Sequence, residues 1–273
     1  MQGQVNGLTR TGGWKPSAAI KASAVLHVGA LAGLAVGVAW PWAVGGLLAN
    51  HAVLTIAGLW PRSSLLGSNM QRLSQAACDA QQISITIDDG PNPQVTPAVL
   101  DILDEANAHA TFFCIGKAVE THPHLAREIV RRGHTIENHS YAHRHHFSIM
   151  GLSQLRHEIG KAQTVISQVT GRRPAYFRAP AGLRSPLLDP VLQGLNLELV
   201  SWTRRGFDTV ATDPNKVLKK LEKNLSAGDI LLLHDGNAAC SPNGKPVLLD
   251  VLPKLLATVR TRGLHAVSLR DAA

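Results

Sequence analysis

The stretch "SITIDDGPNP", residues 84–93, runs from β-branched residues directly into two adjacent acids, a glycine and a proline. Ile and Thr favour strands, whereas Gly and Pro favour turns. The apolar run that precedes the acids predicts a buried strand. Asp88 and Asp89 therefore stand at the C-terminal end of this strand, where a turn begins, and two carboxylates side by side at such a place need a chemical reason.

Strands and helices alternate along the chain on the C-terminal side of this stretch. Short apolar runs predict strands at 82–87, 110–115, 134–138, 175–178, 198–202, 229–233 and 265–269. Helical periodicity is found between them at 96–107, 122–133, 152–171, 213–225 and 246–263. The alternation predicts an α/β domain with a parallel sheet, either closed as a barrel or open and doubly wound.

The N-terminal segment has a different composition. No Lys, Arg, Asp or Glu occurs from Ala22 to Trp60, and Pro41 interrupts this apolar run. One membrane crossing takes about 20 apolar residues, so the run is long enough for two. We expect a basic tail at 1–21, a transmembrane helical hairpin or anchor at 22–60, a polar linker at 61–81 and the α/β domain at 82–273. A single span, an uncleaved signal anchor and a buried soluble hairpin remain alternatives.

Basic residues flank the apolar run on both sides, and its turn has no charge. The flanking cations are Arg10, Lys15, Lys21, Arg62 and Arg72. By the positive-inside rule both ends face the cytoplasm, which predicts an inner-membrane protein with a cytoplasmic catalytic domain. A periplasmic domain on a single anchor is the alternative. Asn50 and His51 count against a second span, because polar groups are costly in a bilayer.

Overall composition narrows the partners. The chain has 273 residues, 45% hydrophobic content and a net charge of +8. The cations are dispersed and no basic run is interleaved with aromatic residues, so we expect no nucleic-acid partner, whereas an anionic membrane surface fits. Three distant cysteines indicate neither a zinc knuckle nor a disulfide framework. The sequence does not indicate an oligomeric state.

Titratable residues follow five of the predicted strands. In parallel α/β domains the C-terminal ends of the strands meet at one edge, which is where functional residues gather. The residues concerned are Asp88, Asp89, His139, His143, Arg178, Asp208, His234 and Asp235. Five strands that deliver such groups to one edge are more informative than any single motif.

The spacing of these residues predicts a metal-assisted hydrolase. His139 and His143 are spaced i, i+4, so on a helical turn they would face the same way and bind one divalent metal together with a carboxylate. Zinc is the metal expected by default. One of the two acids can be that ligand, while the other takes a proton from the attacking water as general base.

The other residues complete the machinery for hydrolysis of an amide. Arg178 can hold the base carboxylate ionised, and the backbone N–H that follows Pro180 can stabilise an oxyanion. His234 would protonate the leaving amine, with Asp208 aligning its imidazole.

The ordered motifs resemble those of the NodB-homology polysaccharide deacetylases, a carbohydrate esterase family with a distorted (β/α)-barrel. The matching segments between residues 82 and 270 are "TIDDGP" (86–91), "HSYAH" (139–143), "RAPAG" (178–182), "WTRRGFDT" (202–209) and "LLLHD" (231–235). The resemblance implies a distorted (β/α)7-type barrel with Asp88 as base, Asp89, His139 and His143 as metal ligands, and His234 as acid.

Two departures from the family pattern concern the substrate. Ala181 stands where the family has an aromatic residue, and Thr209 stands where a Trp usually follows the motif aspartate. We expect Pro180, Ala181, Trp202 and Leu232 to line the substrate site. The aromatic content of 4% favours a short or lipid-linked substrate over a long polymer.

The predicted function is metal-dependent removal of an N-acyl group, expected to be acetyl, from an amino sugar in a polysaccharide or glycoconjugate. The alternatives are a deformylase or deacylase of a lipid-linked amino sugar at the inner membrane face, a non-catalytic carbohydrate-binding relative and a membrane scaffold. Taken alone, a DDGP turn or an HxxxH pair is more often structural than catalytic.

Overall fold

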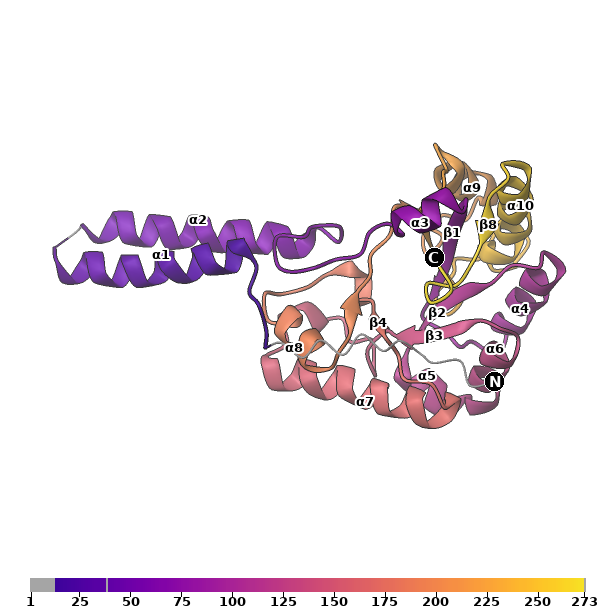
Figure 1. Ribbon diagram of the computed structural model, residues 1–273, viewed down its shortest axis with the longest axis horizontal. Helices are drawn as coiled ribbons and strands as arrows, with labels where there is room; N and C mark the ends of the chain where they lie inside the picture. The colour runs from indigo at the N-terminus through magenta and orange to yellow at the C-terminus, as the bar shows by residue number, and fades with distance from the viewer. Residues whose placement is uncertain (1–12, 38, 273) are drawn as a thin grey trace.

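The computed structural model describes residues 13–37 and 39–272. Residues 1–12, with Arg10 of the expected basic tail, lie outside the described residues. Two parts are visible: a long helical hairpin formed by α1 and α2, and an α/β domain from which the hairpin projects (Figure 1). The separation follows the change in composition near residue 60.

A curved parallel sheet forms the centre of the domain. Its strand order is β5-β4-β3-β2-β1-β7-β6, and β8 pairs with the start of β1. All pairings between these strands are parallel. The strands are β1 (Gln82–Asp88), β2 (Ala110–Cys114), β3 (Thr135–Asn138), β4 (Tyr176–Phe177), β5 (Glu198–Leu199), β6 (Arg204–Arg205), β7 (Ile230–His234) and β8 (His265–Ala266).

β1 is buried on both faces, as its sequence predicts. Ile83, Ile85 and Ile87 belong to the large outer core, which is shared with the surrounding helices. The alternate residues, among them Thr86 and Asp88, lie on the opposite, inner face because side chains alternate along a strand. The acid at the end of β1 therefore faces the inside of the curved sheet.

Amphipathic helices lie around the outside of the sheet (Figure 1). They are α4 (Thr96–Glu105), α5 (Gly116–Thr121), α6 (Pro123–Arg131), α7 (Leu152–Thr170), α8 (Leu188–Gly194), α9 (Pro214–Glu222) and α10 (Val247–Thr261). The short α3 (Gln75–Asp79) instead packs on the inner face, where Ala77 shares a core cluster with Phe113 and Leu232. Pro occupies the first turn of α4, α6 and α9, where its missing N–H costs nothing. The predicted α/β class and distorted barrel are confirmed.

The barrel is incomplete, and the predicted linker fills the gap. β5 and β6 end the sheet and do not pair with each other among the described strands. Met70 pairs with Val200, which follows β5, and Arg72 pairs with Asp229, which precedes β7. Residues 61–81, expected as a linker, thus run along the open side of the sheet, with Leu66, Leu73 and Ala77 buried.

Two strands differ from the sequence expectation. The strand expected at 198–202 ends at Leu199, and a separate strand, β6, follows at Arg204–Arg205. The strand expected at 265–269 is confined to His265–Ala266. Both strands have few pairing partners in the sheet, and strand propensity alone does not predict how many residues find a partner.

The hairpin consists of α1 (Ala18–Ala35) and α2 (Trp40–Leu59), both long and apolar enough to cross a membrane by length and composition. Its polar residues meet across the two helices. Asn50 donates to the Ser23 hydroxyl (Nδ2–Oγ 2.9 Å), and the His27 and His51 rings are 5.3 Å apart. Asn50, which argued against a second span, is therefore paired inside the hairpin, whereas His51 remains exposed.

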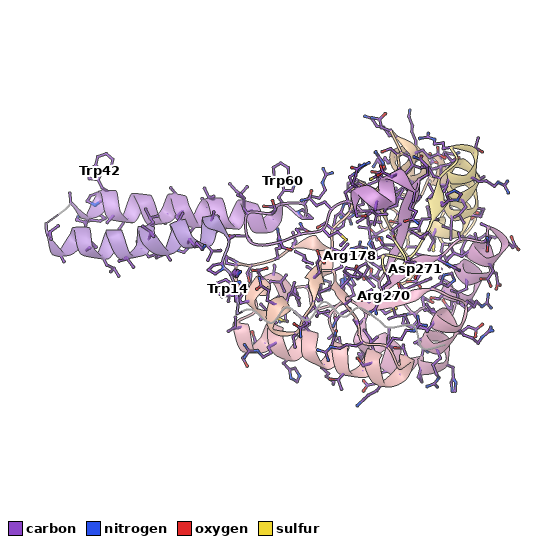
Figure 2. All side chains as sticks on the ribbon, in the orientation of Figure 1. Trp14, Trp42, Trp60, Arg178, Arg270 and Asp271 are labelled. Carbon is purple, nitrogen blue, oxygen red and sulfur yellow. The ribbon has the colours of Figure 1, made fainter. Side chains whose placement is uncertain are left out.

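The last turn of α2 packs against the α/β domain. The Arg184 N–H donates to the Gly58 carbonyl (3.1 Å), and a Cβ at Gly58 would lie 2.2 Å from the Arg184 carbonyl oxygen. The Ser201 hydroxyl donates to the Pro61 carbonyl (2.6 Å). Trp42 and Trp60 lie towards opposite ends of α2 (Figure 2). The hairpin is thus joined to the domain by direct contacts as well as by the chain.

Candidate active site

Asp89, His139 and His143 form a cluster that could hold a metal ion. Their potential ligand atoms all lie within 4.8 Å of one another. The Nε2 atoms of both histidines are 3.3 Å from the same Asp89 oxygen, Oδ1, which is buried and accepts no conventional hydrogen bond. A carboxylate and two imidazoles converging in this way are the ligand types that zinc prefers.

The two histidines do not lie on a helical turn, so that expectation is wrong. His139 and His143 lie in the loop after β3, which turns through Ser140 (φ 62°) and His143 (φ 45°) in the left-handed region. Two left-handed residues fold the loop back on itself, which brings the rings to 4.9 Å. The i, i+4 spacing correctly predicted that the two rings converge, but a loop brings them together and not a helix.

Hydrogen bonds orient the ligands from behind. His139 Nδ1 lies 2.8 Å from the Arg178 carbonyl and donates to it, which leaves Nε2 as the free ring nitrogen. Asn237 donates to the other Asp89 oxygen (Nδ2–Oδ2 2.9 Å). Both contacts turn the remaining ligand atoms towards the centre of the cluster.

Charges within the cluster shift its protonation. Burial raises the pKa of Asp89, but the His139 imidazole 3.3 Å away, with the charges of His234 and His143, outweighs burial and holds that pKa far below its usual range. Burial and the neighbouring His139 lower the pKa of His143. Burial lowers the pKa of His139, but the Asp88 and Asp89 carboxylates outweigh it and raise that pKa, so a cation would bind by displacing the His139 proton.

Asp88 is held by a buried arginine. Arg178 Nη1 donates to Asp88 Oδ1 and to the Thr86 hydroxyl, both at 2.7 Å, and Nη2 donates to the Ser201 carbonyl at 3.0 Å. Arg178 is 1% exposed and lies in the interior of the domain (Figure 2). Burial lowers its pKa, with Asp88 opposing. The ion pair fixes the Asp88 carboxylate, while Asp88 Oδ2 is 3.9 Å from His139 Nε2.

His234 and Asp208 form a second pair. The two lie 3.0 Å apart (Nδ1–Oδ1), and the His234 N–H donates to Asp208 Oδ2 at 2.7 Å. Burial lowers the pKa of His234, but the hydrogen bond and charge of Asp208 outweigh it, so the pKa is raised. A raised pKa favours the protonated imidazole, which can act as a general acid.

A short turn after β4 supplies a free backbone donor. In η2 (Pro180–Gly182) the N–H groups of Gly182 and Leu183 bond to the carbonyls of Ala179 and Pro180. The N–H of Ala181, a residue in the left-handed region (φ 54°), has no such partner among the described residues. Two successive left-handed residues, Ala181 and Gly182, shape this turn.

The predicted residues surround one cavity of about 200 Å³. Its lining includes Asp88, Asp89, His139, His143, His234, Ala181, Trp202 and Leu232. Pro180, expected in the substrate site, is buried in the η2 turn and is not part of the lining, and Arg178 and Asp208 lie behind it. The structure therefore brings the expected catalytic, metal and substrate residues together around the cavity. Pro180, Arg178 and Asp208 lie behind the residues that line it.

Some residues at the site were not predicted from the sequence. Asn237 and Arg205 line the cavity without having been expected there. Asp235, which the sequence places at this edge after a strand, is fully buried and is not part of the lining. Thr96 donates to Asp235 (Oγ1–Oδ2 2.5 Å), while burial and the Asp89 charge raise the pKa of Asp235 to about 7. The signal that the sequence offered for Asn237 was its polar side chain, three positions after His234.

The fold and site define a class of protein: a parallel half-barrel whose carboxyl edge carries an Asp-His-His cluster, a carboxylate paired with a buried arginine and a histidine paired with an aspartate. Residues 76–200 match the family model described as "Polysaccharide deacetylase". The chitooligosaccharide deacetylase of Azorhizobium caulinodans is 37% identical over 207 residues, which are 71% of this chain and 97% of that protein. A peptidoglycan-N-acetylglucosamine deacetylase of Bacillus cereus is 31% identical over 191 residues, 69% of this chain and 86% of that protein.

A solved structure agrees with these relatives. The family 4 carbohydrate esterase from Streptomyces lividans, in complex with acetate, superposes with a TM-score of 0.63 at 28% identity and covers 72% of this chain and 97% of that one. The chain belongs to the polysaccharide deacetylase family. It is a hydrolase of carbon–nitrogen bonds other than peptide bonds, as its motifs predicted.

Proposed function

We propose that the protein is a metal-dependent deacetylase that hydrolyses the N-acetyl group of an amino sugar. The observation that carries the proposal is the convergence of His139 and His143 on one Asp89 oxygen, in a cavity that also contains Asp88 and His234. The named activities of the relatives, on chitooligosaccharides and on peptidoglycan N-acetylglucosamine, support it. A non-catalytic carbohydrate-binding role would not need this complete set.

The cluster fits a divalent metal because Asp89 Oδ1 is buried and accepts no conventional hydrogen bond, although two imidazole nitrogens lie 3.3 Å from it. Asp89, His139 and His143 would hold the ion, and we propose zinc from this mixed nitrogen and oxygen ligand set. When bound, the metal would act as a Lewis acid towards the acyl oxygen and the attacking water.

The residues of the chain divide the remaining steps. Asp88, fixed by Arg178, takes one proton from the water that attacks the amide carbon. The free N–H of Ala181 donates to the oxyanion that forms on the acyl oxygen. His234, charged and aligned by Asp208, gives its proton to the amine as the carbon–nitrogen bond breaks, so that acetate and a free amino sugar leave.

The cavity wall favours a small acyl group. Leu232 and Trp202 supply apolar surface beside the catalytic groups, whereas Ala181 and Thr209 are small. A pocket of about 200 Å³ has room for an acetyl or formyl group and part of one sugar ring. Formyl remains the alternative to acetyl on the same chemistry.

A second candidate is an amino sugar linked to a membrane lipid. The turn that carries Ala181 rests on Pro61, just beyond the end of α2, since a Cβ at Gly182 would lie 2.8 Å from the Pro61 Cβ. Trp60, next to Pro61, is 59% exposed, and Trp is enriched at membrane interfaces. If the hairpin spans the bilayer, the cavity opens close to the lipid headgroups and can receive a sugar attached to a lipid.

The decisive experiment measures acetate or formate released by the full-length, zinc-loaded protein in detergent from N-acetyl and N-formyl amino sugars, short oligomers and lipid-linked forms. Asp88→Asn should abolish release without loss of bound zinc, and Arg156→Gln, at an exposed position on α7, is the control. Release that persists in Asp88→Asn would contradict the proposal. For sidedness we propose a cytoplasmic domain, and a C-terminal reporter that signals from the periplasm would refute it.

A further inference from the structure

Arg204 and Arg205 are adjacent in β6, yet their guanidinium groups have opposite environments. Arg204 donates to Asp229 (Nε–Oδ2 2.6 Å) and to the carbonyls of Lys223 and Asn224. Arg205 is half-buried, and its guanidinium has no hydrogen-bond or ion-pair partner in the part of the chain that the structure describes. Its Nε is buried without an acceptor. Burying a charged donor without an acceptor is costly, so the fold must tolerate this group for another reason.

Aromatic rings hold the Arg205 guanidinium in place. Its central carbon is 5.5 Å from the Trp202 ring centre and 5.0 Å from the Phe207 ring centre. Stacking on rings occupies the faces of a guanidinium and leaves the N–H groups in its plane free to donate. The Arg205 donors are therefore fixed in position but not used within the protein.

The backbone next to Arg205 is strained. Phe207 has φ 63°, an unfavourable conformation for an aromatic residue. At Gly206 a Cβ would lie 2.5 Å from Val217 Cγ1, so only glycine fits there. Strain of this kind persists where the surroundings require one arrangement, and it concentrates at functional sites.

Arg205 lines the same cavity as the catalytic residues. The other basic groups at the site are already engaged, because Arg178 pairs with Asp88 and His234 with Asp208. Arg205 therefore adds an unneutralised positive charge to the wall of the substrate cavity. An acetyl group has no charge that would need it.

We propose that Arg205 binds an oxyanion group, phosphate or carboxylate, that the amino-sugar substrate carries close to its N-acyl group. The proposal rests on the proposed function and specifies the substrate class further. A guanidinium edge matches the paired oxygens of either group. The group could be a phosphate that joins the sugar to a lipid or the carboxylate of an acidic sugar.

The test compares three substrates that differ in charge: the methyl glycoside of N-acetylglucosamine, N-acetylglucosamine 1-phosphate and N-acetylglucosaminuronic acid. The full-length zinc-loaded protein is assayed as wild type, Arg205→Gln, Arg205→Lys and the exposed control Arg156→Gln. We expect Arg205→Gln to lower kcat/KM by about 10- to 100-fold for an anionic substrate and by less than about threefold for the neutral one. Arg205→Lys should fall between. The anionic sugar on which Arg205→Gln loses kcat/KM shows whether Arg205 binds a phosphate or a carboxylate.

Calorimetric titration with the same sugars keeps the outcomes distinguishable. If wild type releases no acetate from any sugar, the proposed deacetylase function fails, and binding alone decides the role of Arg205. Weaker binding of an anionic sugar by Arg205→Gln supports the inference. An equal loss on neutral and anionic sugars, no loss on any, or no binding of anionic sugars by wild type would overturn it.

Discussion

The substitution Asp208→Asn tests how the acid of the reaction is kept protonated. Asp208 is fully buried and lies 3.0 Å from His234 Nδ1. Asn keeps the size of the side chain and an oxygen that can accept from the His234 N–H, now bonded at 2.7 Å, so the fold should be retained. What is lost is the negative charge beside the imidazolium.

The size of the effect follows from that lost contact. A buried hydrogen bond to a charged group contributes about 1.5–3 kcal/mol, and 1.36 kcal/mol corresponds to one pH unit. The pKa of His234 is raised by Asp208 in the wild type, so activity that needs protonated His234 is present below this pKa and lost as the pH rises through it. In Asp208→Asn the loss should occur about 1–2 pH units lower.

The assay is the pH dependence of kcat/KM for acetate release between pH 5 and 10, with bound zinc measured at each pH. The alkaline limb should shift downwards while the rate at the lowest pH stays closer to that of the wild type. An alkaline limb that does not move, or a loss of rate that is the same at every pH, would refute the role of Asp208 as the partner that keeps His234 charged.

Three further predictions follow from the contacts described. Asp88→Asn should keep the bound metal but lower kcat by about 10²–10⁴-fold, whereas His139→Ala should also lose metal; metal analysis of both decides, and full metal in His139→Ala would contradict the ligand assignment. Arg178→Met leaves Asp88 buried and unpaired, so the free energy of unfolding in denaturant should fall by about 3–5 kcal/mol, and a value near that of wild type would argue against the buried pair. Gly58→Val should destabilise the domain by about 1–3 kcal/mol, whereas Gly45→Val in the same helix, with no atom within 4 Å of its Cβ, should not; equal melting temperatures would contradict the packing of α2 on the domain.

Most of the site could be predicted because its residues follow directly after strands. The apolar run ending at Asp88 predicted both a buried strand and its carboxyl end, and the order of the motifs predicted which groups would meet. The HxxxH spacing suggested a helix, but the loop uses left-handed residues at Ser140 and His143, which no periodicity encodes.

Other features depend on long-range contacts that a sequence pattern does not contain. Residues 61–81 read as a linker because they are polar, yet they pair with Val200 and Asp229 across the open side of the sheet. In the sequence, Arg205 was interpreted only as one of many dispersed cations. Only the neighbouring pairing of Arg204 with Asp229 shows that the two adjacent arginines have different environments.

The contact between Pro61 and Gly182 has a consequence for how this protein can be altered. The hairpin and the α/β domain are not exchangeable modules, because Pro61, just beyond the end of α2, lies against the turn that presents Ala181. A fragment that starts at the first strand would keep every catalytic side chain and lose that wall. Replacing the hairpin with an unrelated helical hairpin should therefore impair turnover, unless residues 58–61 are carried over with the enzyme.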